Sequence, residues 1–361
     1  MEERRFFSYD LIKSTAIYLV CLYHFGAMNI YSPQQADYTV HFNYFFLSIT
    51  SIGVPLFFMV NGALLLNREY SLKRHLYKIV MIAVLFFVWS AITLIFLAPL
   101  FGDHYSASQF IKAIYYTKDG RTTHLWFLNA MIYLYLMFPL IKALYDKHEK
   151  RYTAYLWVLV FICTFGIVLF NNLVNSFGYL SNNVAWQVKH ISPFSWINPF
   201  SSQFSYVLVY FIAGGWIASN TKTIKASNTI WILFLLGSWL FLFIFGLIKT
   251  IIHGELYDTT WNGYNTVMTL LMSMSVFILC SRINLPPTKL KKIVTTISIN
   301  SLGIYFIHIP VGFWLAGYYE SLAVSNYLLV DICYAFFLLL VSLIISMTLK
   351  KIPVLERLVK I

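Results

Sequence analysis

Ten runs of about twenty apolar residues, separated by short polar segments, constrain the fold of this 361-residue chain more than any other feature. A run of this length crosses the ~30 Å hydrocarbon core of a bilayer as a helix. Because a segment in lipid can satisfy its own backbone hydrogen bonds only as a helix, the sequence predicts an all-α, polytopic integral membrane protein with about ten transmembrane helices. The runs cover residues 8–29, 43–66, 76–100, 124–145, 153–171, 203–219, 229–250, 264–281, 294–316 and 327–349.

Composition also favours lipid over water as the main solvent. Hydrophobic residues make up 59% of the chain and charged residues 11%, with a mean hydropathy of +0.70, whereas a soluble domain carries about 25% charged residues. The four cysteines all lie inside apolar runs. They are typical of small core residues and indicate neither a metal site nor a redox pair.

The basic residues predict the orientation, because short cytoplasmic loops accumulate Lys and Arg. With the N-terminus inside, 20 of the 26 Lys and Arg residues fall on the inner side and five on the outer side. Both termini are therefore expected in the cytoplasm. Most of the net charge of +12 follows from this topology, so no nucleic-acid partner is expected.

The chain is expected to form a single membrane-embedded domain over residues 1–361, with no C-terminal extracellular domain. The first run carries Asp10, Lys13 and His24 and offers no small-residue cleavage site, so it is expected to remain as helix one rather than to be removed as a signal peptide. The longest outer loops are predicted at 101–123 and 172–202. The second is rich in aromatic residues and turn formers, and it either caps a cavity or serves as a solvated connector.

Ionisable residues at membrane depth point to function, since they are costly in lipid and usually face a cavity. Asp10, Lys13 and His24 lie on one side of the first predicted helix. Asp10 and Lys13 form either an interfacial ion pair or part of a site. His24 lies in the outer half of the span and has no partner at metal-ligand spacing, so no metal is expected. A neutral imidazole suits proton transfer or transient acyl transfer.

The stretch DLIKSTAIYLVCLYH, from Asp10 to His24, resembles the opening helix of the acyltransferase-3 family of bacterial membrane acyltransferases. Four further stretches resemble later helices in the same order: SIGVPLFFMVNGALLL from Ser51, SLKRHLYKI from Ser71, HLWFLNAMIYLYLMFPLI from His124 and ISINSLGIYFIHIPV from Ile297. Two positions depart from the family pattern. Lys13 stands where Arg is usual, so the planar guanidinium that binds a phosphate or carboxylate with two hydrogen bonds is missing. Asn61 replaces Ser before Gly62.

The resemblance implies transfer of an acyl group, usually acetyl, from cytoplasmic acetyl-CoA to a hydroxyl of a cell-surface or exported carbohydrate, in a bacterial plasma membrane. The acceptor would be a polysaccharide, a teichoic acid or a glycolipid. Because the chain ends at Ile361, soon after its tenth predicted helix, a second extracytoplasmic step would need another protein, such as one of a polysaccharide-assembly system. His24 would act as general base or transient acyl carrier, with Lys13 and Asp10 positioning the donor.

Other polar residues are candidates for binding, each with a structural alternative in helix packing or in topology. The basic residues expected to hold the coenzyme A phosphates are Lys73, Arg74 and Lys78. The residues expected to contact substrate are Asn61, His124, Trp126, Asn129, Ser301, Tyr305, His308 and Asp331. Asp331 has no partner nearby in the sequence, so it is expected to pair with a histidine or to line the acceptor pocket.

Two other functions stay open at this level. The same bundle with intramembrane His and Asp residues is compatible with a transporter, either a flippase for a lipid-linked saccharide or a proton-coupled carrier. A structural partner in a polysaccharide-assembly complex is the third interpretation. It predicts that His24 can be replaced without loss.

Overall fold

The computed structural model describes residues 6–25, 46–116, 121–146, 150–187, 189–191, 197–253, 261, 263–283, 286, 288–321 and 328–360. These residues form helices and turns and contain no strand, which confirms the all-α class. Parts of the predicted runs, at 26–29 and 43–45, lie outside the described residues. Contacts divide the chain into two compact units, and each is described by itself. The expectation of a single domain over 1–361 stays a prediction.

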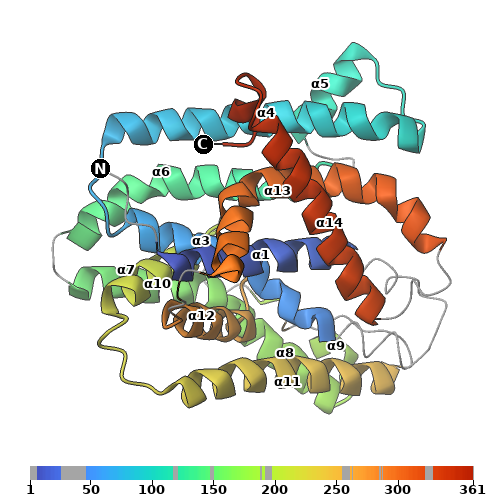
Figure 1. The fold of residues 1–361 in the computed structure, drawn as a ribbon. Helices are drawn as coiled ribbons and strands as arrows, with labels where there is room; N and C mark the ends of the chain where they lie inside the picture. Colours follow the sequence, from blue (N-terminus) through green and yellow to red (C-terminus); the bar gives the residue numbers. More distant parts are fainter. Residues whose placement is uncertain are drawn as a thin grey trace. The chain divides into compact units, whose positions relative to one another are not determined.

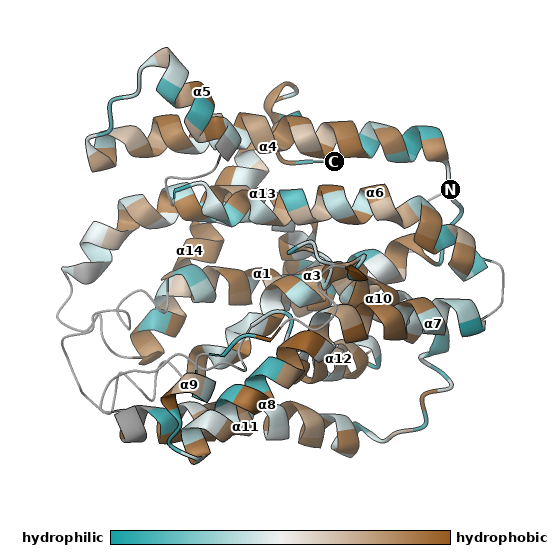
Figure 2. Cartoon of the chain, turned by 180° about the vertical axis from the view of Figure 1, so that it is seen from behind, coloured by the Kyte–Doolittle hydropathy of each residue, from teal (hydrophilic) through white to brown (hydrophobic). Residues whose placement is uncertain are grey.

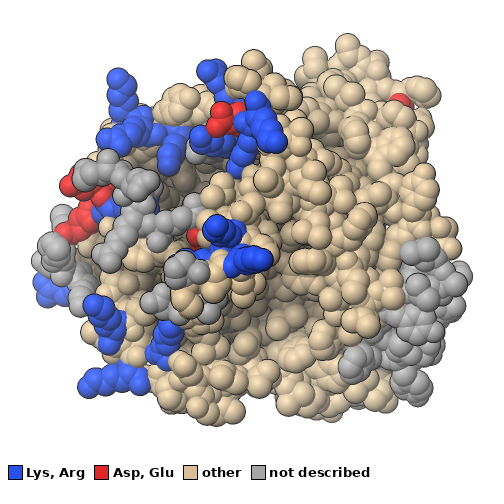
Figure 3. Space-filling model, viewed as in Figure 1, with Lys and Arg blue, Asp and Glu red and all other residues tan. Residues whose placement is uncertain are grey.

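Seven described helical segments are long and apolar enough to cross a membrane. The shorter apolar helices α10 (Val207–Asn220) and α12 (Val267–Ser281) match two further predicted runs. The first predicted run forms α1 (Phe7–Phe25), which is less apolar because it carries Asp10, Lys13 and His24. Figure 2 shows α10 and α12 as brown over most of their length, whereas the first turns of α4 are teal. Large uncharged areas, tan in Figure 3, cover the face in view, as expected for surfaces that meet lipid.

Unit 1 comprises residues 1–32, 70–139 and 284–361. Its helices are α1, α4 (Leu72–Phe101), α5 (Ala107–Tyr116), the start of α6 (Trp126–Asp146), α13 (Lys289–Glu320) and α14 (Leu328–Leu349) (Figure 1). Helix α1 packs against both α13 and α14, and α13 also contacts α4. Helix α5 lies inside the segment 101–123 that the sequence predicts only as a loop.

Two features of α13 show how closely unit 1 is packed. A Cβ atom on Gly312 would lie 2.2 Å from the ring of Phe25 on α1, and one on Gly303 would lie 2.1 Å from the Ser346 hydroxyl on α14. Residues without a side chain allow helix backbones to approach in lipid. Helix α13 therefore fits between α1 and α14 because glycine occupies both contact positions.

A proline explains one buried polar contact in unit 1. Pro139 has no N–H, so the carbonyl of Tyr135, one turn earlier on α6, loses its helical hydrogen bond. The ring of His75 on α4 supplies the replacement: its Nε2 lies 2.7 Å from the Tyr135 carbonyl oxygen, and the His75 and Tyr135 rings stack at 5.1 Å. His75, which no sequence argument selected, thus joins α4 to α6.

Unit 2 comprises residues 33–69 and 140–283. A 3-10 turn (Ser48–Ile52) leads into α3 (Gly53–Leu65), and the C-terminal part of α6 follows. Helix α7 (Lys150–Phe161) continues through a π-helical turn (Ile162–Gly166) into α8 (Ile167–Leu180), and α9 (Val184–Gln187), α10, α11 (Asn228–His253) and α12 complete the unit. Of the predicted outer loop 172–202, residues 172–180 are therefore helical, and 192–196 lie outside the described residues.

Close contact between α3 and α10 organises the centre of unit 2. A Cβ atom added to Gly214 would lie 2.0 Å from the carbonyl oxygen of Met59, and one added to Gly62 would lie 1.8 Å from that of Phe211. These distances are shorter than any van der Waals contact. Both glycines are therefore required for the approach of the two backbones.

We expect Gly214→Ala to lower the free energy of unfolding by about 1–3 kcal/mol, because the added methyl group forces α3 and α10 apart. The matched control is Gly237→Ala on α11, where the added Cβ meets no atom of the described residues within 4 Å. This control should be neutral or slightly stabilising, since alanine is the better helix former. Thermal unfolding of the detergent-solubilised protein measures both, and equal effects of the two changes would contradict the packing argument.

Candidate functional site

Three histidines from three separate segments of unit 1 lie next to one another. His24 is at the C-terminal end of α1, His308 is within α13, and His124 is in the 3-10 turn Thr123–Leu125 that precedes α6. The ring centres of His24 and His308 are 5.3 Å apart, and those of His308 and His124 are 6.0 Å apart. Packing of the three segments therefore brings together three candidate residues that are far apart in the chain.

Tyr305 completes this group, which we call the histidine cluster (His24, His124, Tyr305 and His308). The Tyr305 hydroxyl donates a hydrogen bond to the carbonyl oxygen of His124, and its ring centre lies 5.9 Å from that of His124. Phe127 packs against the Tyr305 ring at 5.3 Å. Tyr305 therefore links α13 to the turn that carries His124.

The members of the cluster differ in burial. His308 is completely buried and His124 is 4% exposed, whereas His24 is half-buried. Tyr23, beside His24, is 45% exposed and packs edge-on against the His24 ring. By exposed surface, His24 is therefore the least enclosed of the three imidazoles.

Hydrogen bonding fixes the tautomer of His308. Its Nδ1 lies 2.6 Å from the carbonyl oxygen of Tyr305, and because a carbonyl oxygen only accepts, Nδ1 carries the proton and donates. In the neutral ring, Nε2 then holds a lone pair. This atom is buried and makes no hydrogen bond among the described residues.

His124 is buried, and neither of its ring nitrogens makes a well-formed hydrogen bond to the part of the chain that the structure describes, although the ring lies near the Arg121 backbone. Buried polar atoms are usually paired, because an unmet hydrogen bond costs about 1–3 kcal/mol. The cluster thus contains three imidazole nitrogens that a bound hydroxyl, carbonyl or water could satisfy. An arrangement of this kind is typical of a binding or reaction site rather than of a structural core.

The turn that carries His124 is held by an ion pair and by backbone contacts. Arg121 pairs with Asp103, and its guanidinium lies 4.1 Å from the centre of the Phe101 ring at the end of α4. The Leu125 amide donates to the Thr122 carbonyl at 3.0 Å. Sequence reasoning missed Arg121 and Asp103 because neither lies in an apolar run.

Asp10, at the other end of α1, contacts α13 by two hydrogen bonds. The Ser298 hydroxyl donates to Oδ1 at 2.7 Å and the Thr295 hydroxyl donates to Oδ2 at 3.2 Å. Nearby, the Ser14 hydroxyl donates to the Val294 carbonyl at 2.8 Å. Asp10 is 5% exposed, and its two hydrogen bonds join the first turns of α1 to α13. Lys13 is half-buried one turn further along α1.

The remaining sequence candidates occupy several places. Trp126 and Asn129 are half-buried in the first turns of α6, and Ser301 is buried on α13, one turn before Tyr305. Asp331 on α14 is 2% exposed and accepts a hydrogen bond from the Tyr319 hydroxyl of α13, so its observed partner is a tyrosine and not a histidine. Asn61 lies in unit 2, where its amide donates to the Phe57 carbonyl at 2.9 Å.

The basic candidates lie on the first two turns of α4, also in unit 1. Lys73 and Arg74 are exposed, and Lys78 is half-buried. Arg74 and Lys78 are four residues apart and therefore share one side of the helix. Between them, His75 holds this part of α4 to α6 by the contact with Tyr135 described above.

The described residues contain no group of three or more His, Cys, Asp or Glu side chains arranged to hold a metal ion. The cluster is chemically suited to acid–base work, because it brings the nitrogen bases of three imidazole rings together. An imidazole titrates near neutral pH and can accept a proton from a hydroxyl and return it.

Comparison with known proteins agrees with the motifs. A family model described as an acyltransferase domain matches residues 6–350, which is nearly the whole chain. No curated protein and no solved structure matches the chain. The match includes all three histidines of the cluster and both units. The chain therefore belongs to the acyltransferase-3 family of membrane acyltransferases.

Proposed function

We propose that this protein transfers an acetyl group from cytoplasmic acetyl-CoA to a hydroxyl of a cell-surface or exported carbohydrate, and that the histidine cluster carries out the reaction. The observation that carries the proposal is the half-buried His24 beside the enclosed His308. A bacterial plasma membrane and a polysaccharide, teichoic acid or glycolipid acceptor belong to the same proposal.

In the proposed reaction, His24 acts as general base, because it is the accessible imidazole of the cluster. The acceptor oxygen attacks the thioester carbonyl carbon while one His24 nitrogen takes the hydroxyl proton. As the carbon–sulfur bond breaks, the thiolate of coenzyme A leaves and receives that proton from the His24 imidazolium. The products are the acetyl ester and coenzyme A, and His24 returns to its neutral form.

His308 acts through His24 as a positioning residue. Its Nε2 lone pair can accept an N–H from His24, which would leave the other His24 nitrogen free to act as the base. Two imidazole rings joined by one N–H···N bond of about 3 Å have centres about 5 Å apart, close to the 5.3 Å between His24 and His308. A small ring rotation would form this bond, since catalytic hydrogen bonds often tighten only when substrate binds.

Other candidate residues of unit 1 would bind the acyl donor and the carbohydrate acceptor. The exposed Lys73 and Arg74, with Lys78, are placed on one helix end where phosphates of coenzyme A could bind by charge. The unsatisfied nitrogens of His124 suit the developing oxyanion or the acceptor's neighbouring hydroxyls. Asp10 would hold α1 against α13, so that His24 and His308 stay adjacent.

Replacing His24 by alanine should reduce acetyl transfer by about a hundredfold to ten-thousandfold, the usual cost of losing a general base. The measurement is release of free coenzyme A from acetyl-CoA in native membranes, which contain the acceptor. His104→Ala is the matched control, since His104 is an exposed histidine of the same unit. A His24→Ala protein that is folded and fully active would refute the role of His24 as the base.

Two amide substitutions test the orientation of His24. In His308→Gln the amide oxygen comes near the position of Nε2 and can still accept the His24 N–H, whereas in His308→Asn the amide group reaches only the position of Nδ1. We expect the Gln variant to keep a substantial part of kcat. The Asn variant should lose about tenfold to a hundredfold, as a misplaced reacting group does.

Both variants should retain the KM for acetyl-CoA, because His308 acts on the chemical step. Steady-state kinetics of the two variants in native membranes, which contain the acceptor, separate these outcomes once each purified protein is shown to have the wild-type unfolding temperature. Equal kcat values for the Gln and Asn variants, or a change confined to KM, would show that His308 does not orient His24.

A further inference from the structure

Unit 2 contains a pocket of about 880 Å³ that the proposed acyl transfer does not use. It lies among the C-terminal ends of α3, α6 and α10 and the first turns of α7, and Met274 of α12 completes it. Its volume is within the range of small-molecule sites, about 300–1,000 Å³. Every residue that lines it belongs to unit 2.

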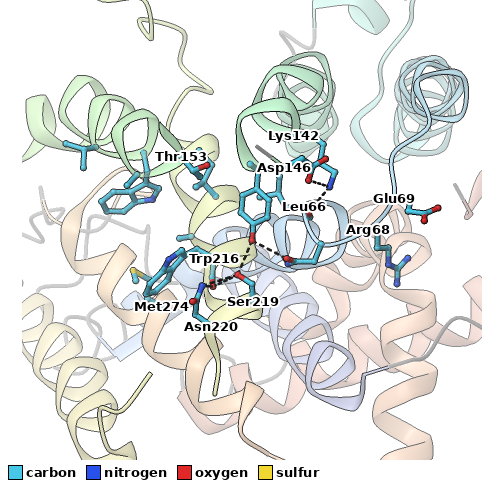
Figure 4. A pocket seen from close by; sticks show the side chains of 17 residues that line it. Leu66, Arg68, Glu69, Lys142, Asp146, Thr153, Trp216, Ser219, Asn220 and Met274 are labelled. Atoms are coloured by element: carbon cyan, nitrogen blue, oxygen red, sulfur yellow. Dashed lines mark hydrogen bonds and ion pairs between the residues drawn. The ribbon is translucent and has the colours of Figure 1, made fainter. Parts of the chain in front are cut away.

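One end of the pocket is polar. Lys142 is buried, and its Nζ donates to the Leu66 carbonyl at 2.9 Å and to an Asp146 carboxylate oxygen at 2.6 Å. The Tyr145 hydroxyl lies 3.0 Å from the Ser219 hydroxyl and 3.1 Å from the Asn67 amide oxygen. Figure 4 shows this network, with Arg68 and Glu69 beyond it on the chain that leaves α3.

The other end is apolar and open to the outside of unit 2. Trp157, Ile212, Trp216 and Met274 line it, and Figure 4 shows Trp216 and Met274 on the side away from Arg68 and Glu69. The side chain of Trp216 is 46% exposed, and that of Val158 is 47% exposed. In a membrane protein, exposed apolar side chains next to a helix end meet lipid tails.

The charges at the polar end are balanced. Two cations and two carboxylates line it: Lys142 pairs with Asp146, which is about half exposed, and Arg68 and Glu69 follow α3. Three helices also end here, at Leu65, Asp146 and Asn220, and a helix C-terminus carries partial negative charge. The site therefore offers partners for both signs of charge and favours a cationic group over a net negative one.

We propose that this pocket binds one phospholipid whose headgroup carries both a phosphate and a primary ammonium, as in phosphatidylethanolamine. The ammonium would lie toward Asp146 and the helix C-termini, and the phosphate toward Arg68 and Lys142. One acyl chain would run along Trp157, Trp216 and Met274. An anionic phospholipid would lack a partner for the carboxylates, and a choline headgroup has no N–H to donate.

The test is native mass spectrometry of the full-length, delipidated protein after incubation with equal amounts of phosphatidylethanolamine, phosphatidylglycerol and phosphatidylcholine. We expect one phosphatidylethanolamine to remain bound at collision energies that remove the other two. Ala154→Trp, an exposed position that lines the pocket, should fill it and abolish this retention. Ala143→Trp on α6, exposed but outside the lining, is the matched control and should retain the lipid.

A second pair of variants tests the headgroup contacts. Asp146→Asn should lower the preference for phosphatidylethanolamine over phosphatidylglycerol by about fivefold, equivalent to the loss of one exposed charge contact. Glu356→Gln is its control, because Glu356 forms a similar i,i+4 pair with Lys360 and does not line the pocket. Unchanged retention in Ala154→Trp, or equal binding of all three lipids, would overturn the proposal. Neither result depends on acyl transfer, so the two proposals fail separately.

Discussion

A polar group that leaves water in a membrane protein needs a partner inside the protein, because lipid offers none. Much of the structure follows from that requirement. Pro139 cannot donate to the Tyr135 carbonyl on α6, and the ring of His75 on α4 makes a hydrogen bond to that carbonyl instead. In the π-helical turn between α7 and α8, the Cys163 carbonyl accepts a hydrogen bond from the Asn198 side-chain amide at 3.0 Å. Asp10 is satisfied by two hydroxyls of α13.

The histidine cluster departs from that requirement. Three of its buried imidazole nitrogens make no well-formed hydrogen bond within the described ranges, while the Tyr305 hydroxyl donates to the His124 carbonyl. Buried hydroxyls such as those of Ser90, Ser275 and Ser342 also lack a partner among the described residues, but in the cluster the unsatisfied atoms belong to adjacent imidazole rings, which can exchange protons with a substrate. The difference in burial between His24 and His308 then divides their tasks, since only the accessible ring can meet an acceptor while the enclosed ring can hold it in orientation.

The length and hydropathy of the apolar runs predict the membrane-spanning helices, because these two properties determine which segments cross a bilayer. Helix α4 shows the limit of that approach. Its apolar stretch predicts a span from residue 76, yet the helix begins at Leu72 because Lys73 and Arg74 are also good helix formers. Helix α5 was not predicted, since its ten residues are too short to span a bilayer. The extension of α8 to Leu180 was missed because Asn171, Asn172 and Asn175 interrupt the apolar run.

The candidate site was predictable only in part. Residue type and depth selected His24, His124, Tyr305 and His308 one by one, and the family motifs placed them on helices. The contact between these side chains could not be predicted from the sequence, because it depends on how α1, α13 and the turn before α6 pack. The tautomer of His308 depends on a single carbonyl of its own helix, and the Asp331 partner turned out to be Tyr319 of α13. Such details are set by tertiary geometry that local patterns do not contain.

A double-mutant cycle on His24 and His308 tests the central claim, that the two imidazoles act as one catalytic unit. Coenzyme A release would be measured for the wild type, His24→Ala, His308→Ala and the double variant under the same conditions. If His308 acts only through His24, the double variant should be no slower than His24→Ala alone, as residues that function together are strongly non-additive. Losses that multiply in the double variant would contradict the account, because they would mean that the two histidines contribute independently.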